Sequence, residues 1–178
     1  MRHVYPIFRD TESGERADRV VLETWSHGRL YTFNETLLPE GAELAARPDA
    51  VADRILFLRE GSISVTAAGC SANVQAPAGV VLRGRGHRVV HSGSGLVRMI
   101  DLMVQPEPGS DAALRSSASI AVRPISSDAF LAYKSHRGQG DAFDVQVLGD
   151  RETGSPHARF FAAVVKPDSG MKRHVHRV

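Results

Sequence analysis

Two histidines near the end of the chain, His174 and His176, have the spacing of metal ligands. Residues i and i+2 of a β-strand lie on the same face of the sheet, about 6 to 7 Å apart along the chain. Two imidazole nitrogens can then bind one ion, and further ligands must come from other strands. Imidazole with carboxylate suits Fe, Mn, Ni, Zn or Cu, so the residue types do not select the metal. The alternative is a solvated basic tail over residues 172–177.

A second set of polar residues lies near the middle of the chain. His87 and His91 are four residues apart, which on a strand also places them on one face. With Asp49 or Asp53 and with Arg47, they are candidates to line a barrel interior and bind a metal or a polar molecule. Of these two, we favour the small-molecule pocket over a metal site. The alternative is that both histidines are hydrogen-bonded interior or rim residues.

Several arginines are candidates to clamp a carboxylate or a phosphate group, because the guanidinium fork matches both anions. The alternative is that they form a solvated basic rim. They are Arg47, Arg54, Arg83, Arg85 and Arg88.

Short apolar runs separated by turn residues predict the elements that must position these side chains. Residues 62–66 alternate polar and apolar with period two, as a half-buried strand does. Residues 55–58 form a continuous apolar run, which indicates a buried strand. Further strand-like runs occupy residues 20–22, 30–33, 72–75, 80–82, 88–90, 96–104, 120–122, 143–148 and 158–165. Because Gly, Pro and Ser separate these runs, the sequence predicts an all-β sandwich or small barrel.

The stretch between two glycines, Gly41 and Gly61, resembles the first motif of the cupin family, G-x5-H-x-H-x3,4-E-x6-G. The two histidine positions of that motif are filled here by Arg47 and Asp49, and its glutamate position by Arg54. Arginine cannot ligate a metal, so the resemblance implies a barrel whose metal site has degenerated.

The second cupin motif, P-x-G-x2-H-x3-N, finds a counterpart further along the chain. Leu82, Gly84, His87 and His91 fall at its Pro, Gly, His and Asn positions, so His87 alone matches a ligand. In the first motif, a slip of one residue would place Asp53 at the glutamate position instead of arginine.

The C-terminal residues resemble the start of another first motif. Pro167 and Gly170 precede His174 and His176, with Asp168 at the place of the opening glycine. The glutamate, the closing glycine and the second motif have no counterpart before the sequence ends. The resemblance therefore implies a two-domain cupin cut off early in its second barrel.

The resemblance implies a cupin-type double-stranded β-helix, a jelly-roll barrel, followed by part of a second one. The predicted divisions are a cupin-like barrel at 1–104, a linker at 105–116 and the second domain at 117–178. The leading functional hypothesis is a piece of a metal-dependent bicupin that acts on a small oxygenated substrate, as dioxygenases or isomerases do. The competing hypothesis is a metal-free module that binds a small ligand or dimerises.

Composition narrows the partners. The net charge is +2, and the basic residues are scattered among acidic ones, so nucleic-acid binding is not predicted. No apolar stretch has the length of a membrane helix, and the N-terminus lacks the apolar region of a signal peptide. The single cysteine, Cys70, excludes an intrachain disulfide. We expect a cytoplasmic homodimer with a small-molecule ligand.

Overall fold

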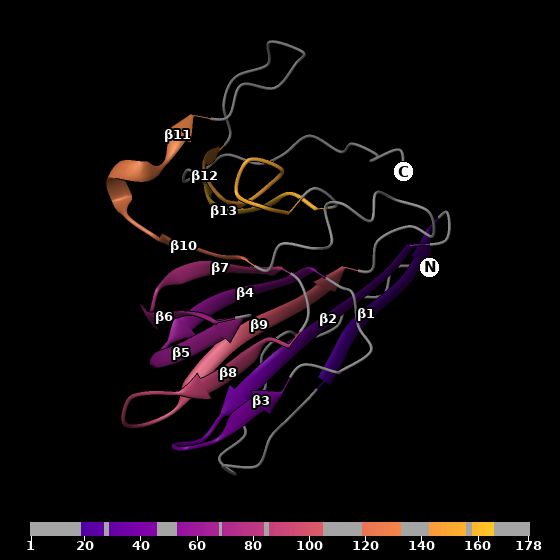
Figure 1. Cartoon of the computed structure of the whole chain (residues 1–178). Helices are drawn as coiled ribbons and strands as arrows, with labels where there is room; N and C mark the ends of the chain where they lie inside the picture. The colour runs from indigo at the N-terminus through magenta and orange to yellow at the C-terminus, as the bar shows by residue number, and fades with distance from the viewer. Residues whose placement is uncertain are drawn as a thin grey trace.

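The structure, a computed structural model, describes residues 19–26, 29–45, 53–67, 69–83, 86–104, 119–132, 143–155 and 158–165. Strands make up nearly all of its regular structure, which confirms the all-β prediction (Figure 1). The strands are β1 (Arg19–Ser26), β2 (Arg29–Leu38), β3 (Glu43–Ala45), β4 (Asp53–Glu60), β5 (Ser62–Ala67), β6 (Cys70–Gln75), β7 (Ala78–Arg83), β8 (Arg88–His91), β9 (Val97–Val104), β10 (Ser119–Pro124), β11 (Leu131–Ala132), β12 (Phe143–Gly149) and β13 (Phe160–Val165). A short 3-10 turn, Ser127–Ala129, lies between β10 and β11. No helix in these ranges is long and apolar enough to cross a membrane.

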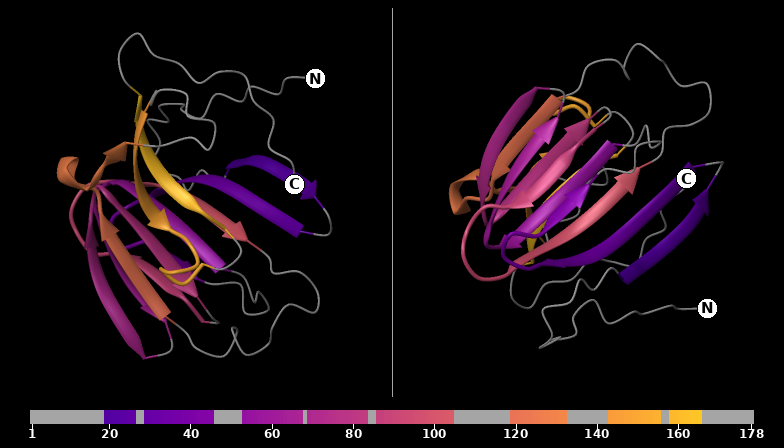
Figure 2. Two further views of the ribbon diagram at one scale, coloured as in Figure 1. Left: turned by 90° about the horizontal axis from the view of Figure 1, so that it is seen from above. Right: turned by 60° about the horizontal axis from the view of Figure 1, so that its bottom comes forward.

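Two antiparallel sheets form the barrel (Figures 1 and 2). The larger sheet has six strands in the order β1-β2-β9-β4-β7-β10, and the smaller has four in the order β3-β8-β5-β6. Leu56 and Met99 of the larger sheet share one buried apolar cluster with Ile63 and Val89 of the smaller sheet. The hydrophobic core therefore lies between the two sheets, as in a jelly roll.

The burial of each strand follows its sequence pattern. Burial alternates along β5: Ile63 and Val65 are fully buried, while the polar residues on either side of them are half-buried. β7 is buried along almost its whole length, because it has structure against both of its faces. Val80 and Leu82 belong to the barrel core, while Gly79 and Val81 lie under a second layer of strands.

That second layer is a three-stranded sheet in the order β11-β12-β13. A Cβ atom added at Gly79 would lie 2.6 Å from Cβ of Leu148, so only glycine permits this approach. The rings of Phe57 on β4 and Phe160 on β13 meet edge to face, with centroids 6.2 Å apart. The C-terminal strands thus cover the outer face of β4 and β7.

The predicted linker, 105–116, lies outside the described residues. The first strand after it, β10, pairs with β7 from Ser119 opposite Arg83 to Pro124 opposite Ala78. β10 therefore extends the large sheet of the barrel. Gln146 of β12 attaches the second layer to this strand, since its amide nitrogen donates to the Pro124 carbonyl at 2.7 Å.

Candidate functional site

A buried ion pair occupies the barrel interior. Arg54 of β4 donates from Nε to Oδ1 of Asp101 on β9 at 2.9 Å, and from Nη2 to Oδ2 at 2.5 Å. The two residues are only 6% and 4% exposed. Leu56, two residues along β4, is fully buried in the core, so alternation places Arg54 on the interior face. A bidentate pair of this kind has a fixed geometry and needs its two partners together.

His87 lies within electrostatic range of this pair and is only 5% exposed. Burial lowers the pKa of His87 below its ordinary value of 6.5, because the charged ring would lose its hydration. A hydrogen bond to the backbone of Arg83 acts in the opposite direction, and the charges of Arg54 and Asp101 lower and raise this pKa respectively. The net result is a neutral imidazole at neutral pH.

The hydrogen bonds of His87 also indicate where its proton lies. Its Nε2 is buried without a partner. The bond to the backbone of Arg83 favours the protonated ring, so the backbone group is the carbonyl oxygen, which accepts from the ring. That bond must then use Nδ1. The neutral ring carries its proton there, and Nε2 presents a free lone pair. We call Arg54, Asp101 and His87 the interior cluster.

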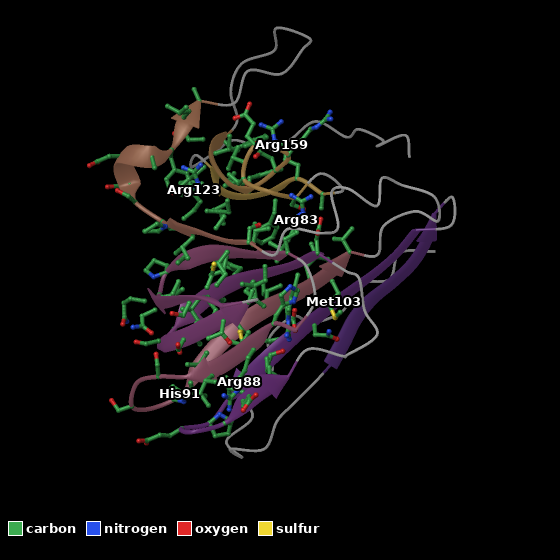
Figure 3. All side chains as sticks on the ribbon, in the orientation of Figure 1. Arg83, Arg88, His91, Met103, Arg123 and Arg159 are labelled. Carbon is green, nitrogen blue, oxygen red and sulfur yellow. The ribbon has the colours of Figure 1, made fainter. Side chains whose placement is uncertain are left out.

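His91 lies at a separate place in the barrel. It too is 5% exposed, and both of its ring nitrogens are buried without a partner. It is four residues from His87, about 13 Å of extended chain, and the fully buried Val89 lies between them. Figure 3 shows His91 well away from Met103, which pairs with Arg54 across β9 and β4. Both histidines face the interior, but they do not converge on one ion.

Asp53 and Arg88, two other residues singled out from the sequence, face away from the interior cluster. Asp53 is buried on β4, and alternation places it on the opposite face of the strand from Arg54. Arg88 of β8 is exposed and donates to both carboxylate oxygens of Glu43, at 2.5 and 2.6 Å. This pairing raises the pKa of Arg88 and lowers the pKa of Glu43. Arg88 is thus bound to a carboxylate of the protein itself.

The described side chains of the barrel interior do not form the ligand set that a transition metal needs. In the part of the chain that the structure describes, no three His, Cys, Asp or Glu side chains are grouped so as to hold an ion. Both oxygens of Asp101 are bonded to Arg54, which stands at the glutamate position of the cupin motif. A guanidinium therefore occupies the place where the resemblance puts a ligand.

Several predicted site residues lie outside the described residues, so their roles stay predictions. They are Arg47, Asp49, Arg85, His174 and His176. Conversely, the sequence reasoning missed Asp101, the partner of Arg54. Its signal was a carboxylate at an interior position of an otherwise apolar alternation that includes Val97 and Met99.

No family model and no curated protein matches the sequence. The structure is similar to the putative glyoxylate-induced protein of Pseudomonas aeruginosa, with a TM-score of 0.52 and 14% identity over 78% of this chain. It is also similar to an RmlC-like cupin family protein with a double-stranded β-helix fold from Methanocaldococcus jannaschii, with a TM-score of 0.47 and 13% identity over 59% of this chain and 92% of that one. A cupin 2 conserved barrel domain protein from Salinispora arenicola has a TM-score of 0.45 and 15% identity over 64% of this chain and 92% of that one.

The chain has the two-sheet jelly-roll barrel that the sequence resemblance implies, and it shares this fold with the Pseudomonas protein. This confirms the resemblance seen in the sequence at the level of the fold. The match covers only 49% of the Pseudomonas protein. Identities this low establish the fold alone, so the chemistry of the site must be argued from the residues of this chain.

Proposed function

We propose that this cupin barrel is a metal-free binding module for a small oxygenated molecule held at the interior cluster. The observation that carries the proposal is Nε2 of His87, a buried acceptor without a partner. Leaving such a group unpaired costs about 1 to 3 kcal/mol, so a buried polar atom normally has a protein, water or ligand partner. A ligand hydroxyl would supply the missing bond.

Arg54 supports the proposal from the other side of the cluster. A guanidinium has five N–H groups in a fixed fork. Two of them bond Asp101, which leaves three for other acceptors. A small molecule with carbonyl or hydroxyl oxygens can use these donors. Barrels of this size characteristically enclose side chains or one small ligand.

The ligand-binding proposal is tested with the purified chain in excess EDTA. Thermal unfolding is measured with hydroxyacetone, lactate and glycerol as probes, each up to high millimolar concentration. We expect at least one probe to raise the Tm through preferential binding to the folded chain. The rise should be lost in His87→Leu and kept in Arg88→Gln, a control at the neighbouring residue, whose side chain is exposed and bonded to Glu43.

Two results would contradict the proposal. In the first, none of the three probes changes the Tm of the wild-type chain. In the second, stabilisation appears only when EDTA is replaced by a transition metal, which would favour the metal-dependent hypothesis instead. That hypothesis rests on His174 and His176 and on the resemblance of the residues around them to a cupin motif.

A further inference from the structure

The interior cluster has a definite charge. Arg54 and Asp101 carry opposite charges and are bonded to each other, and His87 is held neutral by burial. The sum over the cluster is therefore zero. Bringing a charged ligand into this buried place would require removing its hydration without a net opposite charge to compensate. The cluster is thus suited to a neutral molecule.

The cluster also has a definite pattern of donors and acceptors. Nε2 of His87 needs a donor, because its lone pair has no partner. Arg54 has three N–H groups that do not bond Asp101 and that can donate to a ligand. A carboxylate offers acceptors alone, so it would bond Arg54 but place an oxygen lone pair against Nε2. A hydroxyl group supplies the donor, and a carbonyl oxygen supplies the acceptor.

From this pattern we infer that the ligand of the interior cluster is a neutral hydroxycarbonyl compound. Its hydroxyl group donates to Nε2 of His87, and its carbonyl oxygen accepts from Arg54. The inference rests on the proposed function and adds the chemical class of the ligand. It also separates this barrel from a site for anions, which the number of arginines in the sequence would otherwise favour.

Three small probes differ in one chemical property at a time. Hydroxyacetone has the hydroxyl and the carbonyl, acetone lacks the hydroxyl, and acetate is an anion with acceptors only. Dissociation constants are measured at pH 7.5 by NMR titration of the full chain, with the imidazole 15N signals as the readout. We expect hydroxyacetone to bind about tenfold more tightly than acetone, because acetone leaves Nε2 unpaired. Acetate should bind more weakly still.

The NMR signals locate the binding event. Hydroxyacetone should shift Nε2 of His87, because a lone pair that accepts a hydrogen bond changes its resonance. The signals of His91 should stay in place, since that residue is four positions further along the chain, at the other end of β8. In His87→Leu, hydroxyacetone and acetone should bind with about the same affinity. In Arg88→Gln the preference for hydroxyacetone should remain. The wild-type measurements decide the question by themselves if the leucine variant does not fold.

The outcomes separate the two levels of the argument. Tighter binding of acetate than of hydroxyacetone at the cluster would overturn the inference about ligand class while leaving a binding module. Binding of hydroxyacetone that shifts His91 and not His87 would also overturn it. Absence of binding by all three probes, together with no stabilisation by lactate or glycerol, would remove the proposed function itself.

Discussion

At the residue scale, the pair of Arg54 and Asp101 dominates the interior of the barrel. Two charges have been removed from water there, and their mutual bonds offset that cost only while both are present. Removing one partner leaves the other charge buried and unpaired. The pair is therefore a source of specific geometry more than of stability.

Substitution of one partner should thus be far more harmful than substitution of both. We expect Arg54→Met to lower the free energy of unfolding by about 3 to 5 kcal/mol. The double variant Arg54→Met with Asp101→Leu should recover most of this loss, because two apolar side chains leave no buried charge. Urea unfolding of the three proteins measures the difference. A double variant as unstable as the single one would show that the pair is needed for packing instead.

His87 makes a prediction about pH. The folded state lowers its pKa below 6.5, the value we take for the unfolded chain. Between these two values the unfolded state binds more protons, so His87 contributes stability that is present above pH 6.5 and lost as the pH falls through the folded pKa. Urea unfolding at pH 8, 7, 6 and 5.5 should show this decline. In His87→Leu the decline over the same range should be shallower, and an unchanged slope would contradict the assignment.

At the scale of elements, β7 has close neighbours on both faces. A Cβ atom at Gly79 would lie 2.6 Å from Cβ of Leu148, far inside normal contact. We expect Gly79→Ala to lower the free energy of unfolding by about 1 to 3 kcal/mol, the usual cost of overpacking. Gly93→Ala is the control and should lose less stability, because a Cβ atom there would approach its nearest neighbour, Ser62, only to 3.3 Å. Equal losses in the two variants would show that the C-terminal strands do not press on β7.

At the scale of the whole molecule, the barrel and the C-terminal histidines make separate predictions about metal. We expect any transition metal that copurifies with the chain to depend on His174 and His176. Elemental analysis should then show a loss of metal in the double variant His174→Ala with His176→Ala and no loss in His87→Leu. A loss of metal in His87→Leu would place an ion in the barrel and contradict the metal-free proposal. The expected homodimer and cytoplasmic location stay predictions.

The sequence by itself determined the class of fold and most of its strands. The period-two alternation of residues 62–66 and the apolar run of 55–58 correspond to β5 and β4, because side-chain alternation is a local property of an extended backbone. The turn glycines Gly41 and Gly61 were recognisable too, and both have a positive φ, 73° and 84°, that other residues rarely adopt. These features need no knowledge of the neighbouring strand.

Only the tertiary structure decided which side chains meet. Arg54 and Asp101 are 47 residues apart in the chain, and they bond because β4 and β9 are neighbours in the large sheet. His87 and His91 share a face as predicted, yet the length of strand between them keeps them apart. Pairing between distant strands is set by burial and hydrogen bonding over the whole barrel, which no local pattern encodes. The sequence therefore indicated Arg54 as a candidate site residue, but it did not indicate Asp101 as its partner or the neutral charge of the cluster.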